Sequence, residues 1–547
     1  MDKLGTDLAD MDSAIIEQNA NLFKKLIKKY SEEIKIIHQG GGPLSIEKQH
    51  SKGRLTARER IKNLIDENTK FLELGTFAAW KMYSEYGSPA SSGVISGIGS
   101  ICNIQCVIVA NDATVKAGAY FEVTLKKTIR AQQIALENNI PIIYLVDSAG
   151  VFLPLQDQVF PDEAHFGKIF YNNAKLSANG TAQIACVMGP CVAGGAYLPV
   201  MCDKYIIIDG ASMFLAGPAL VRAAIGQEID EELLGGATTH HSISGTADYH
   251  EKDDLAGIDR IRDLIRNINF SHNYSFKIAK SIEPNFSNEE LISLFSPDNP
   301  SQYDTKEILA RLLDNSEFLE YKKDYGKTIV CGNGKIGGIN VAVVANQKVN
   351  SKTKLGELQL GGVIYSDSAD KAARFVMNAN QDKVPLIFIH DVNGFMVGKV
   401  AEWGGIAKDG AKLVNAVSNS VVPKITLIIG GSYGAGNYAM SGRAYNPSFI
   451  YAWPSAKIAV MGGEQAAKTL TSIKTSKMGD IDESLKKQIF NEIKSKYDKQ
   501  SDPRYAAARI WIDEIIDPRS TRSVIINSLL VVRNKKLDKP NYGVLQV

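Results

Sequence analysis

The chain has 547 residues, of which 44% are hydrophobic and 22% charged, a composition typical of a globular protein with more than one domain. Its 62 lysine and arginine residues nearly balance 60 aspartate and glutamate residues, so a nucleic-acid-binding protein is not expected. No apolar run is long enough to cross a bilayer, and we expect no membrane association. The acidic start MDKLGTDLADMD resembles neither a signal peptide nor a transit peptide, which favours the cytoplasm.

The N-terminal part is predicted to be helical. Residues 12–38 place apolar side chains three and four positions apart, which indicates an amphipathic helix. The run Gly40–Pro43 ends this helix. Thr56 and Glu59 then form a capping-box pattern, which predicts that another helix begins there.

Further along, strands and helices are predicted to alternate. Ile140–Asp147 is one of several short apolar runs rich in β-branched residues, and helical patterns over Glu122–Asn138 and Phe166–Ala178 separate such runs. Alternation of this kind predicts βαβ units and a largely parallel, buried sheet.

The pattern occurs twice in the chain. Ile140–Gly150 recurs 244 residues later as Val384–Gly394. Ala193-Gly194-Gly195 recurs 242 residues later as Ala435-Gly436-Asn437. Two such similar offsets indicate a duplicated domain. The polar, proline-containing segment 281–301 is predicted to link the copies, which sets three expected regions: an N-terminal helical segment (1–42), a first domain (43–295) and a second domain (300–547).

Each copy ends one of its strands in a turn rich in glycine and alanine. The first turn contains Ala193, Gly194 and Gly195, and the second contains Gly434, Ala435 and Gly436. Small residues after a buried strand let the backbone approach a ligand and start the next helix with unpaired N–H groups. Such N–H donors stabilise an oxyanion. A single turn of this type is also explained by tight packing of helix against sheet, but two at equivalent places favour a catalytic role.

Several longer stretches resemble a known family, the carboxyltransferase (β) subunits of biotin-dependent acyl-CoA carboxylases. The resemblance runs from about residue 40 to the C-terminus and is strongest to the β subunit of methylcrotonyl-CoA carboxylase, an enzyme of leucine degradation. The matching stretches are Lys52–Ile61, Val115–Lys127, Phe160–Asn172, Gly189–Pro199, Gly404–Val414, Val422–Met440 and Met461–Ala467.

The resemblance implies an α/β fold of two tandem crotonase-like (ClpP/crotonase) ββα-superhelix domains. It also implies that the turn Ala193-Gly194-Gly195 holds the thioester oxygen of an acyl-CoA as an enolate forms. The turn Gly434-Ala435-Gly436 would hold the ureido oxygen of biotin. Biotin, once decarboxylated, would itself accept the substrate proton, so no acid–base side chain is needed.

Further binding residues are expected beside the two turns. The helix after Gly118 carries Lys126, Lys127 and Arg130, which either form a solvated face or contact CoA phosphates. Gly361 and Gly362 take the place in the second copy that Gly118 takes in the first. Phe395 and Tyr433 complete the expected set of residues that bind biotin or acyl-CoA.

The resemblance also implies partners. No biotinyl-lysine motif and no phosphate-binding loop of the G-x-x-x-x-G-K-[ST] type occur, so carboxybiotin is expected from a biotin carboxylase/biotin carboxyl carrier α subunit. We expect a homo-hexameric core that closes the site between subunits, with no metal on this chain.

Other interpretations remain open. The acyl-CoA could be propionyl- or acetyl-CoA, the reaction could be the decarboxylation catalysed by a glutaconyl-CoA decarboxylase α subunit, or the chain could be an inactive assembly scaffold. His165, His240, His241 and His390 are interpreted as structural or surface histidines. Asp147 and Asp391 are interpreted as residues that cap neighbouring turns or orient the glycine turns.

Overall fold

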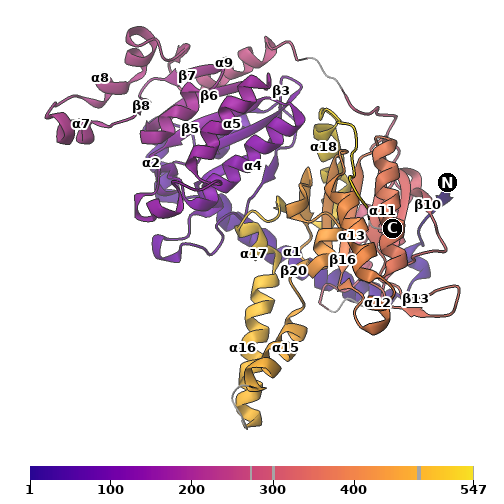
Figure 1. Ribbon diagram of the computed structural model, residues 1–547. Coiled ribbons are helices and arrows are strands. Elements are labelled where there is room, and N and C mark those ends of the chain that lie inside the picture. Colours follow the sequence, from indigo (N-terminus) through magenta and orange to yellow (C-terminus); the bar gives the residue numbers. More distant parts are fainter. Residues whose placement is uncertain (271–273, 299–301, 477–481, 546–547) are drawn as a thin grey trace. The chain divides into compact units, whose positions relative to one another are not determined.

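The computed structural model describes residues 1–270, 274–298, 302–476 and 482–545 (Figure 1). The chain forms two compact units. Unit 1 comprises Met1–Ser31, Tyr274–Ala506 and Trp511–Val547, and unit 2 comprises Glu32–Asn273 and Ala507–Ile510. Each unit contains one large sheet covered by helices, as expected for a duplicated α/β domain.

The sheet of unit 2 has the order β2-β3-β4-β5-β6-β7-β9, with β8 paired to β6. The first two pairings are antiparallel, and all later ones are parallel. Its strands are β2 (Leu72–Leu74), β3 (Val94–Ile101), β4 (Ile104–Asn111), β5 (Ile142–Ser148), β6 (Gln183–Val192), β7 (Lys204–Ile208), β8 (Ser212–Phe214) and β9 (Tyr249–Glu251). Its helices include α3 (Ala57–Leu64), α4 (Glu122–Asn138), α5 (Phe166–Ala178), α6 (Tyr197–Val200), α7 (Pro218–Ile225), α8 (Glu231–Gly235) and α9 (Asp254–Arg266).

The sheet of unit 1 has the order β1-β10-β11-β12-β16-β18-β19-β21, with β20 paired to β18. Its pairings become parallel from β12 onward. Its strands are β1 (Asp2–Lys3), β10 (Glu317–Tyr321), β11 (Ile329–Ile336), β12 (Ile339–Asn346), β16 (Leu386–Val392), β18 (Lys424–Tyr433), β19 (Phe449–Ala452), β20 (Lys457–Ala459) and β21 (Glu514–Ile515). Its helices include α11 (Ser366–Gln381), α13 (Ile406–Ser418), α14 (Gly434–Ala439), α15 (Gly463–Ser476), α16 (Glu483–Ser501) and α18 (Thr521–Val532).

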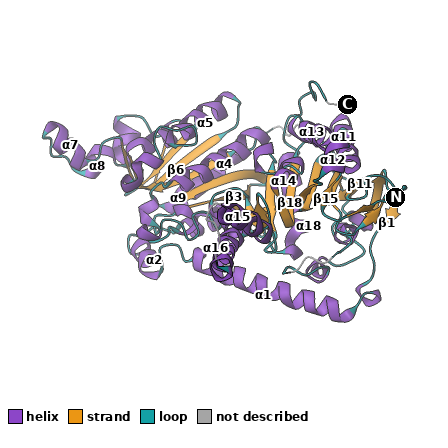
Figure 2. Ribbon diagram, turned by 60° about the horizontal axis from the view of Figure 1, so that its bottom comes forward, coloured by secondary structure: helices purple, strands orange, loops and turns teal. Residues whose placement is uncertain are grey.

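Apart from β1, which has no counterpart in unit 2, the strands of the two sheets correspond in order and direction, which confirms the duplication. Helix α4 packs beside α5 in unit 2, and α11 packs beside α13 in unit 1 (Figures 1 and 2). Every residue of the central strands β5 and β16 is buried. Their first residues, Ile142–Val146 and Leu386–Ile389, carry no charge and are largely apolar, as is typical of a parallel sheet with both faces covered.

The two turns match one residue earlier than the sequence comparison predicted. The first residue after β6 is Ala193, at φ +57°, and the first after β18 is Gly434, at φ +51°. Both adopt the left-handed conformation, so Ala193-Gly194-Gly195 corresponds to Gly434-Ala435-Gly436 rather than to the triplet that begins at Ala435. Sequence letters alone matched Ala-Gly to Ala-Gly, whereas the backbone turn decides the correspondence.

The first residues of the chain belong to unit 1 and do not form a separate segment 1–42. Strand β1 pairs with β10, and the ring of Phe23, on α1 (Ser13–His38), packs edge-on against Phe295 and Trp453. These contacts join Met1–Ser31 to the second half of the chain. Helix α1 itself agrees with the predicted helix 12–38, and the predicted capping box of Thr56 and Glu59 is present.

The predicted linker 281–301 is a packed part of unit 1 over its described residues. Leu291 and Ile292 are buried in a short 3-10 helix (Asn288–Ser293), and Phe295 stacks between Tyr303 and Trp453. Unit 1 therefore resumes at Tyr274, before the predicted boundary at 300. Positions 299–301 lie outside the described residues.

A contact between β5 and β6 gives the first prediction. A Cβ atom at Gly189 would lie 2.1 Å from Oδ1 of Asp147, so Gly189→Ala displaces that carboxylate. We expect the free energy of unfolding to fall by about 1–3 kcal/mol, as measured by urea denaturation. The matched control is Gly167→Ala, because Gly167 lies on α5 with no atom within 4 Å of its Cβ position. This control should stay within about 1 kcal/mol of the wild type. Equal unfolding midpoints for Gly189→Ala and the wild type would contradict the prediction.

Candidate functional site

The first turn follows β6 and leads into a 3-10 helix (Ala193–Ala196) and α6. Ala193 is exposed and holds a left-handed φ, which costs a residue with a Cβ about 1–2 kcal/mol. No atom lies within 4 Å of a Cβ position at Gly195, and the nearest atom at Gly194 is Cε1 of Phe166, at 3.9 Å. Tight packing therefore does not explain these glycines. The strain and the open space favour the alternative, a backbone exposed to a ligand.

The second turn follows β18 and forms the first residues of α14. A cavity of about 530 Å³ adjoins it, lined by Gly434, Ala435, Asn437 and Tyr438, by Ser432 and Arg443, and by apolar residues. These apolar residues include Ile458, Ala459, Val460 and Trp511. No side chain forms a cap hydrogen bond at the start of α14. The first N–H groups of this helix are therefore available to a ligand. A cavity of this size and apolar character suits a small organic group.

Gly436 differs from the other glycines of the turns. A Cβ atom there would lie 2.7 Å from Cγ2 of Val392, so Gly436 is required for packing against β16. Its role as part of a ligand-binding turn remains a prediction. Gly434 and Ala435 are the members of this turn that border the cavity.

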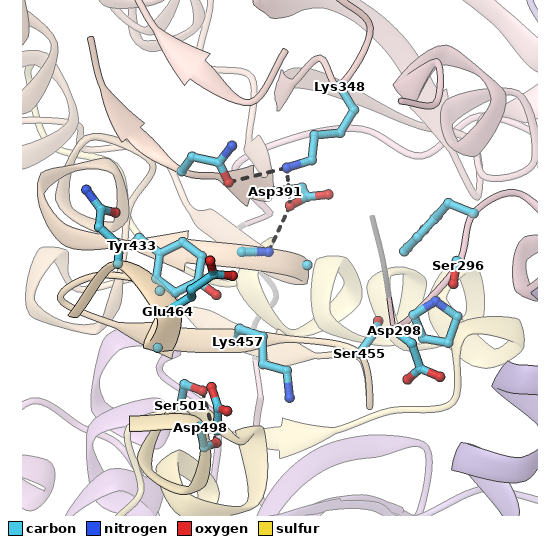
Figure 3. Close-up of a pocket in the computed structure, with 18 of the residues that line it drawn as sticks. Ser296, Asp298, Lys348, Asp391, Tyr433, Ser455, Lys457, Glu464, Asp498 and Ser501 are labelled. Atoms are coloured by element: carbon cyan, nitrogen blue, oxygen red, sulfur yellow. Dashed lines mark hydrogen bonds and ion pairs between the residues drawn. The ribbon is translucent and has the colours of Figure 1, made fainter. Parts of the chain in front are cut away.

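Tyr433 lies directly before the turn but lines a different cavity. This second cavity, of about 630 Å³, also contains Lys348, Asp391, Lys457 and Glu464 (Figure 3). Burial raises the pKa of the Tyr433 hydroxyl to about 12, so the ring stays neutral at physiological pH. Tyr433, which was predicted to bind a ligand, therefore lines a different cavity from Gly434 and Ala435, its neighbours in the chain.

The predicted CoA-phosphate residues on α4 divide into one exposed and two buried side chains. Lys126 is partly exposed and pairs with Glu122. Lys127 is buried, and its ammonium donates to Oγ and O of Ser91 and to O of Val94. Arg130 is also buried. The expectation of one solvated face is therefore wrong for Lys127 and Arg130, because that face of α4 packs on its own unit.

Gly118 and Gly362 occupy equivalent places, as predicted. Both have a left-handed φ, and a Cβ at Gly118 would lie 2.2 Å from O of Asp147. Gly361 is closely packed too, since its Cβ would lie 2.0 Å from O of Lys348. These three glycines allow segments of backbone to pack closely within their own units.

Phe395 lies on β17 (Gly394–Phe395), which pairs with β15 (Val363–Ile364) beside Gly362. A Cβ at Gly410, on α13, would lie 2.9 Å from Cε1 of Phe395. Phe395 therefore packs on α13, and its contact with a ligand remains a prediction.

Sequence reasoning missed two buried cations beside the strand ends. Arg60 lies 2.9 Å from Asp147 and 2.6 Å from Asp254, and Lys348 lies 2.9 Å from Asp391. Arg60 belongs to the stretch Lys52–Ile61 that carried part of the family resemblance, but nothing in that stretch indicated its ionic partner.

His390 is a structural histidine, as interpreted from the sequence. It is fully buried, with Nδ1 3.0 Å from Oγ of Ser432 and Nε2 2.5 Å from O of Met440. Burial lowers its pKa to about 4. His165, His240 and His241 each contact backbone close by in the chain or in β8.

The depressed pKa of His390 predicts a pH-dependent stability. The unfolded chain binds a proton at this residue below its ordinary pKa of about 6.5, whereas the folded chain does so only near pH 4. The contribution of His390 to stability is therefore complete above pH 6.5 and is lost as the pH falls towards 4. Between pH 7 and 5 we expect a loss of about 2 kcal/mol in urea denaturation, and His390→Asn should lack this part of the pH dependence. The same pH dependence in variant and wild type would contradict it.

The described residues contain no group of three or more His, Cys, Asp or Glu side chains that could hold a metal ion. Burial raises the pKa of the thiol of Cys191, on β6, to about 12, so it is a poor nucleophile. None of the helices in the described ranges is long and apolar enough to cross a membrane.

Comparisons with known proteins agree with the resemblance seen in the sequence. The model of the carboxyl transferase domain matches residues 48–543. The chain is 44% identical to the mitochondrial methylcrotonoyl-CoA carboxylase beta chain of Dictyostelium discoideum, over 98% of this chain and 89% of that protein. It is 42% identical to the biotin-dependent 3-methylcrotonyl-coenzyme A carboxylase beta1 subunit of Mycobacterium tuberculosis, over 98% and 99%.

A solved structure gives the same result for the fold. The geranyl-CoA carboxylase beta subunit of P. aeruginosa has a TM-score of 0.86 and 34% identity, with 99% of each chain covered. This likeness confirms the predicted α/β, crotonase-like fold.

Proposed function

The chain belongs to the carboxyl transferase family, and from this membership we propose that it transfers a carboxyl group from carboxybiotin to a short branched or unsaturated acyl-CoA such as 3-methylcrotonyl-CoA. The activity class is that of a biotin-dependent acyl-CoA carboxylase. The roles are assigned from the two glycine turns at equivalent strand ends. The turn at Gly194 and Gly195 has open space beside it, and the turn at Gly434 and Ala435 borders a largely apolar cavity.

The first turn acts on the acyl-CoA. N–H groups at Ala193, Gly194 and Gly195 hold the thioester oxygen, which gains negative charge as the acyl group loses a proton and becomes an enolate. Donors that already point at the developing charge need no reorganisation in the transition state. This role also accounts for the strained backbone of Ala193, the open space at Gly195 and the absence of any close contact at Gly194.

The second turn acts on carboxybiotin, which is a substrate delivered by a partner. N–H groups at Gly434 and Ala435 hold the ureido oxygen, and the apolar cavity takes the ring system. The bond between the ureido nitrogen and the carboxyl carbon breaks and releases CO₂. The ureido nitrogen then accepts the proton of the acyl-CoA, and the enolate carbon forms a bond to CO₂.

Aromatic side chains beside the first turn favour a short acyl group. Phe166 is the nearest neighbour of Gly194, and its ring lies against Tyr120 (4.9 Å between centroids) and Phe170 (5.3 Å). Phe170 in turn contacts Tyr197 (5.7 Å). A row of rings limits the length of an acyl chain and offers an apolar surface to a branched or unsaturated one.

The partners follow from the same reaction. Carboxybiotin is made by a biotin carboxylase/biotin carboxyl carrier α subunit, and this chain forms a homo-hexameric core in the cytoplasm. Lys126 contacts a CoA phosphate, because it is the one cation of the predicted set on α4 whose side chain is partly exposed.

Substitutions in the two turns test the assignment. Gly194→Val and Ala435→Val place side chains where the ligands lie, and neither position is packed against the protein. Loss of an oxyanion donor typically lowers kcat about 10²–10³-fold. In the reverse reaction, with free biotin and the carboxylated acyl-CoA, Gly194→Val should impair use of the CoA ester and Ala435→Val use of biotin.

Stability provides the control for these variants. Melting temperatures should stay near that of the wild type, whereas Gly436→Val should destabilise the chain through its contact with Val392. Wild-type kcat/KM for both substrates in both Gly194→Val and Ala435→Val would contradict the oxyanion assignment.

A panel of acyl-CoA substrates tests the acyl group. With the biotin-bearing partner supplied, 3-methylcrotonyl-CoA should give a higher kcat/KM than propionyl-CoA or geranyl-CoA. Apolar pockets separate acyl groups that differ by one methylene by only about 1–3 kcal/mol, so slow carboxylation of the others is expected. A hundredfold preference for geranyl-CoA would contradict a short acyl pocket.

A further inference from the structure

Two buried ion pairs lie at equivalent places in the two units, and we propose that each is a positioning pair for the glycine turn of its own unit. The first pair is Asp147–Arg60, in which Arg60 also pairs with the buried Asp254 (2.6 Å), and the second is Asp391–Lys348. This inference rests on the proposed function and extends it, because it assigns the first pair to the acyl-CoA half of the reaction and the second pair to the biotin half.

Both acids stand where the sheet register breaks. Asp147 is the last residue but one of β5, and the pairing of β5 with β6 shifts between Val146 and Ser148. Asp391 has the same place in β16, and the pairing with β18 shifts between His390 and Val392. A shift of register redirects the neighbouring strand, which in both units is the strand that ends in the turn.

Each carboxylate touches the strand that carries the turn. Oδ1 of Asp147 lies 2.1 Å from a Cβ position at Gly189, and Cγ and Oδ1 of Asp391 lie 2.5 Å from that at Gly430. Gly189 is four residues before Ala193, and Gly430 is four residues before Gly434. The acids thus occupy the space of a missing side chain at the same distance from each turn.

Directional hydrogen bonds tie each pair to that strand. Nη2 of Arg60 donates to O of Met188 (3.0 Å), and Oδ1 of Asp391 accepts from N–H of Gly431 (2.8 Å). Asp391 also accepts from the hydroxyl of Tyr303 (2.8 Å). Charge-assisted bonds of this kind are short and specific in direction, so they determine where the strand exits.

The two cations come from unrelated parts of the fold. Arg60 lies on α3, whereas Lys348 follows β12, and the two stretches are not related by the duplication. In both units a buried aspartate thus has a cation as its partner, but the cation comes from a different element in each unit. A buried ion pair is weak evidence for stability, because apolar side chains often stabilise such a site as well. The feature common to both sites is that the strand in contact with the aspartate, β6 or β18, ends in a glycine turn. We therefore assign each pair the role of positioning that turn.

The two pairs differ in whether a cavity adjoins them. Both pairs are buried, with side-chain exposures of 1% for Arg60, 3% for Asp147, 7% for Lys348 and 1% for Asp391. Only Lys348 and Asp391, however, line the cavity of about 630 Å³ (Figure 3). A small cation can therefore reach the second pair from this cavity.

The experiment uses the full chain in the reverse reaction, with free biotin and the carboxylated acyl-CoA. Asp391→Asn should lower kcat/KM for biotin at least tenfold and change the KM for the CoA ester less than twofold. Asp147→Asn should show the opposite pattern. The matched control is Asp314→Asn, because Asp314 forms an equally buried pair with Arg522 (2.8 Å) that lies away from either turn. This control should lower the melting temperature and leave both KM values within twofold.

Chemical rescue supplies a second measurement that also serves if an aspartate variant fails to fold. Lys348→Ala should lose kcat/KM for biotin at least tenfold, and ethylammonium should restore most of it, with sodium as the ionic-strength control. Absence of rescue, or rescue of the melting temperature alone, would overturn the positioning role.

The failure of this inference can be told from a failure of the proposed function. If Gly194→Val and Ala435→Val show no selectivity between substrates, the turns are not the ligand sites. If those variants are selective but Asp147→Asn and Asp391→Asn affect both substrates in equal proportion, the pairs are structural only and the inference alone is wrong.

Discussion

Each of the two sheets breaks its register at a buried aspartate, and the strands beside these breaks carry the two glycine turns. Asp147 and Asp391 fill the space left by Gly189 and Gly430. Arg60 pairs with Asp147 and also with Asp254, and Lys348 pairs with Asp391. An uncompensated charge at such depth would be costly, so acid, cation and glycine depend on one another. The direction in which β6 and β18 leave their sheets depends on this contact.

The turns that follow these strands differ in what surrounds them. Ala193 and its two glycines have open space beside them, whereas Gly434 and Ala435 border an apolar cavity. The duplication thus gives two copies of one backbone arrangement, a turn directly after a parallel strand that starts a helix. The neighbouring side chains differ between the two copies. The proposed carboxyl transfer assigns one role to each turn, because in that reaction negative charge develops on two separate oxygen atoms.

Local patterns in the chain were enough for the architecture. Apolar runs and amphipathic stretches predicted the parallel sheets, the capping box of Thr56 and Glu59, and helix α1, because these depend on nearest neighbours along the chain. The recurrence of Ile140–Gly150 as Val384–Gly394 predicted the duplication, and β5 and β16 match at that offset. The boundaries were less accurate, since Phe23 and Phe295 pack on Trp453 from distant parts of the sequence.

The sequence by itself determined the fold class, the duplication, the family and the residues of the two turns, because each is written in a continuous stretch of chain. Tertiary structure alone decided which cations neutralise Asp147 and Asp391, since Arg60 and Lys348 reach them from other elements. It also decided that Lys127 is buried, that Gly436 is a packing residue and that Tyr433 faces a separate cavity. Whether a side chain is buried, and with which charged group it pairs, depends on which elements pack against each other. The spacing of residues along one strand or helix does not indicate which element packs against it.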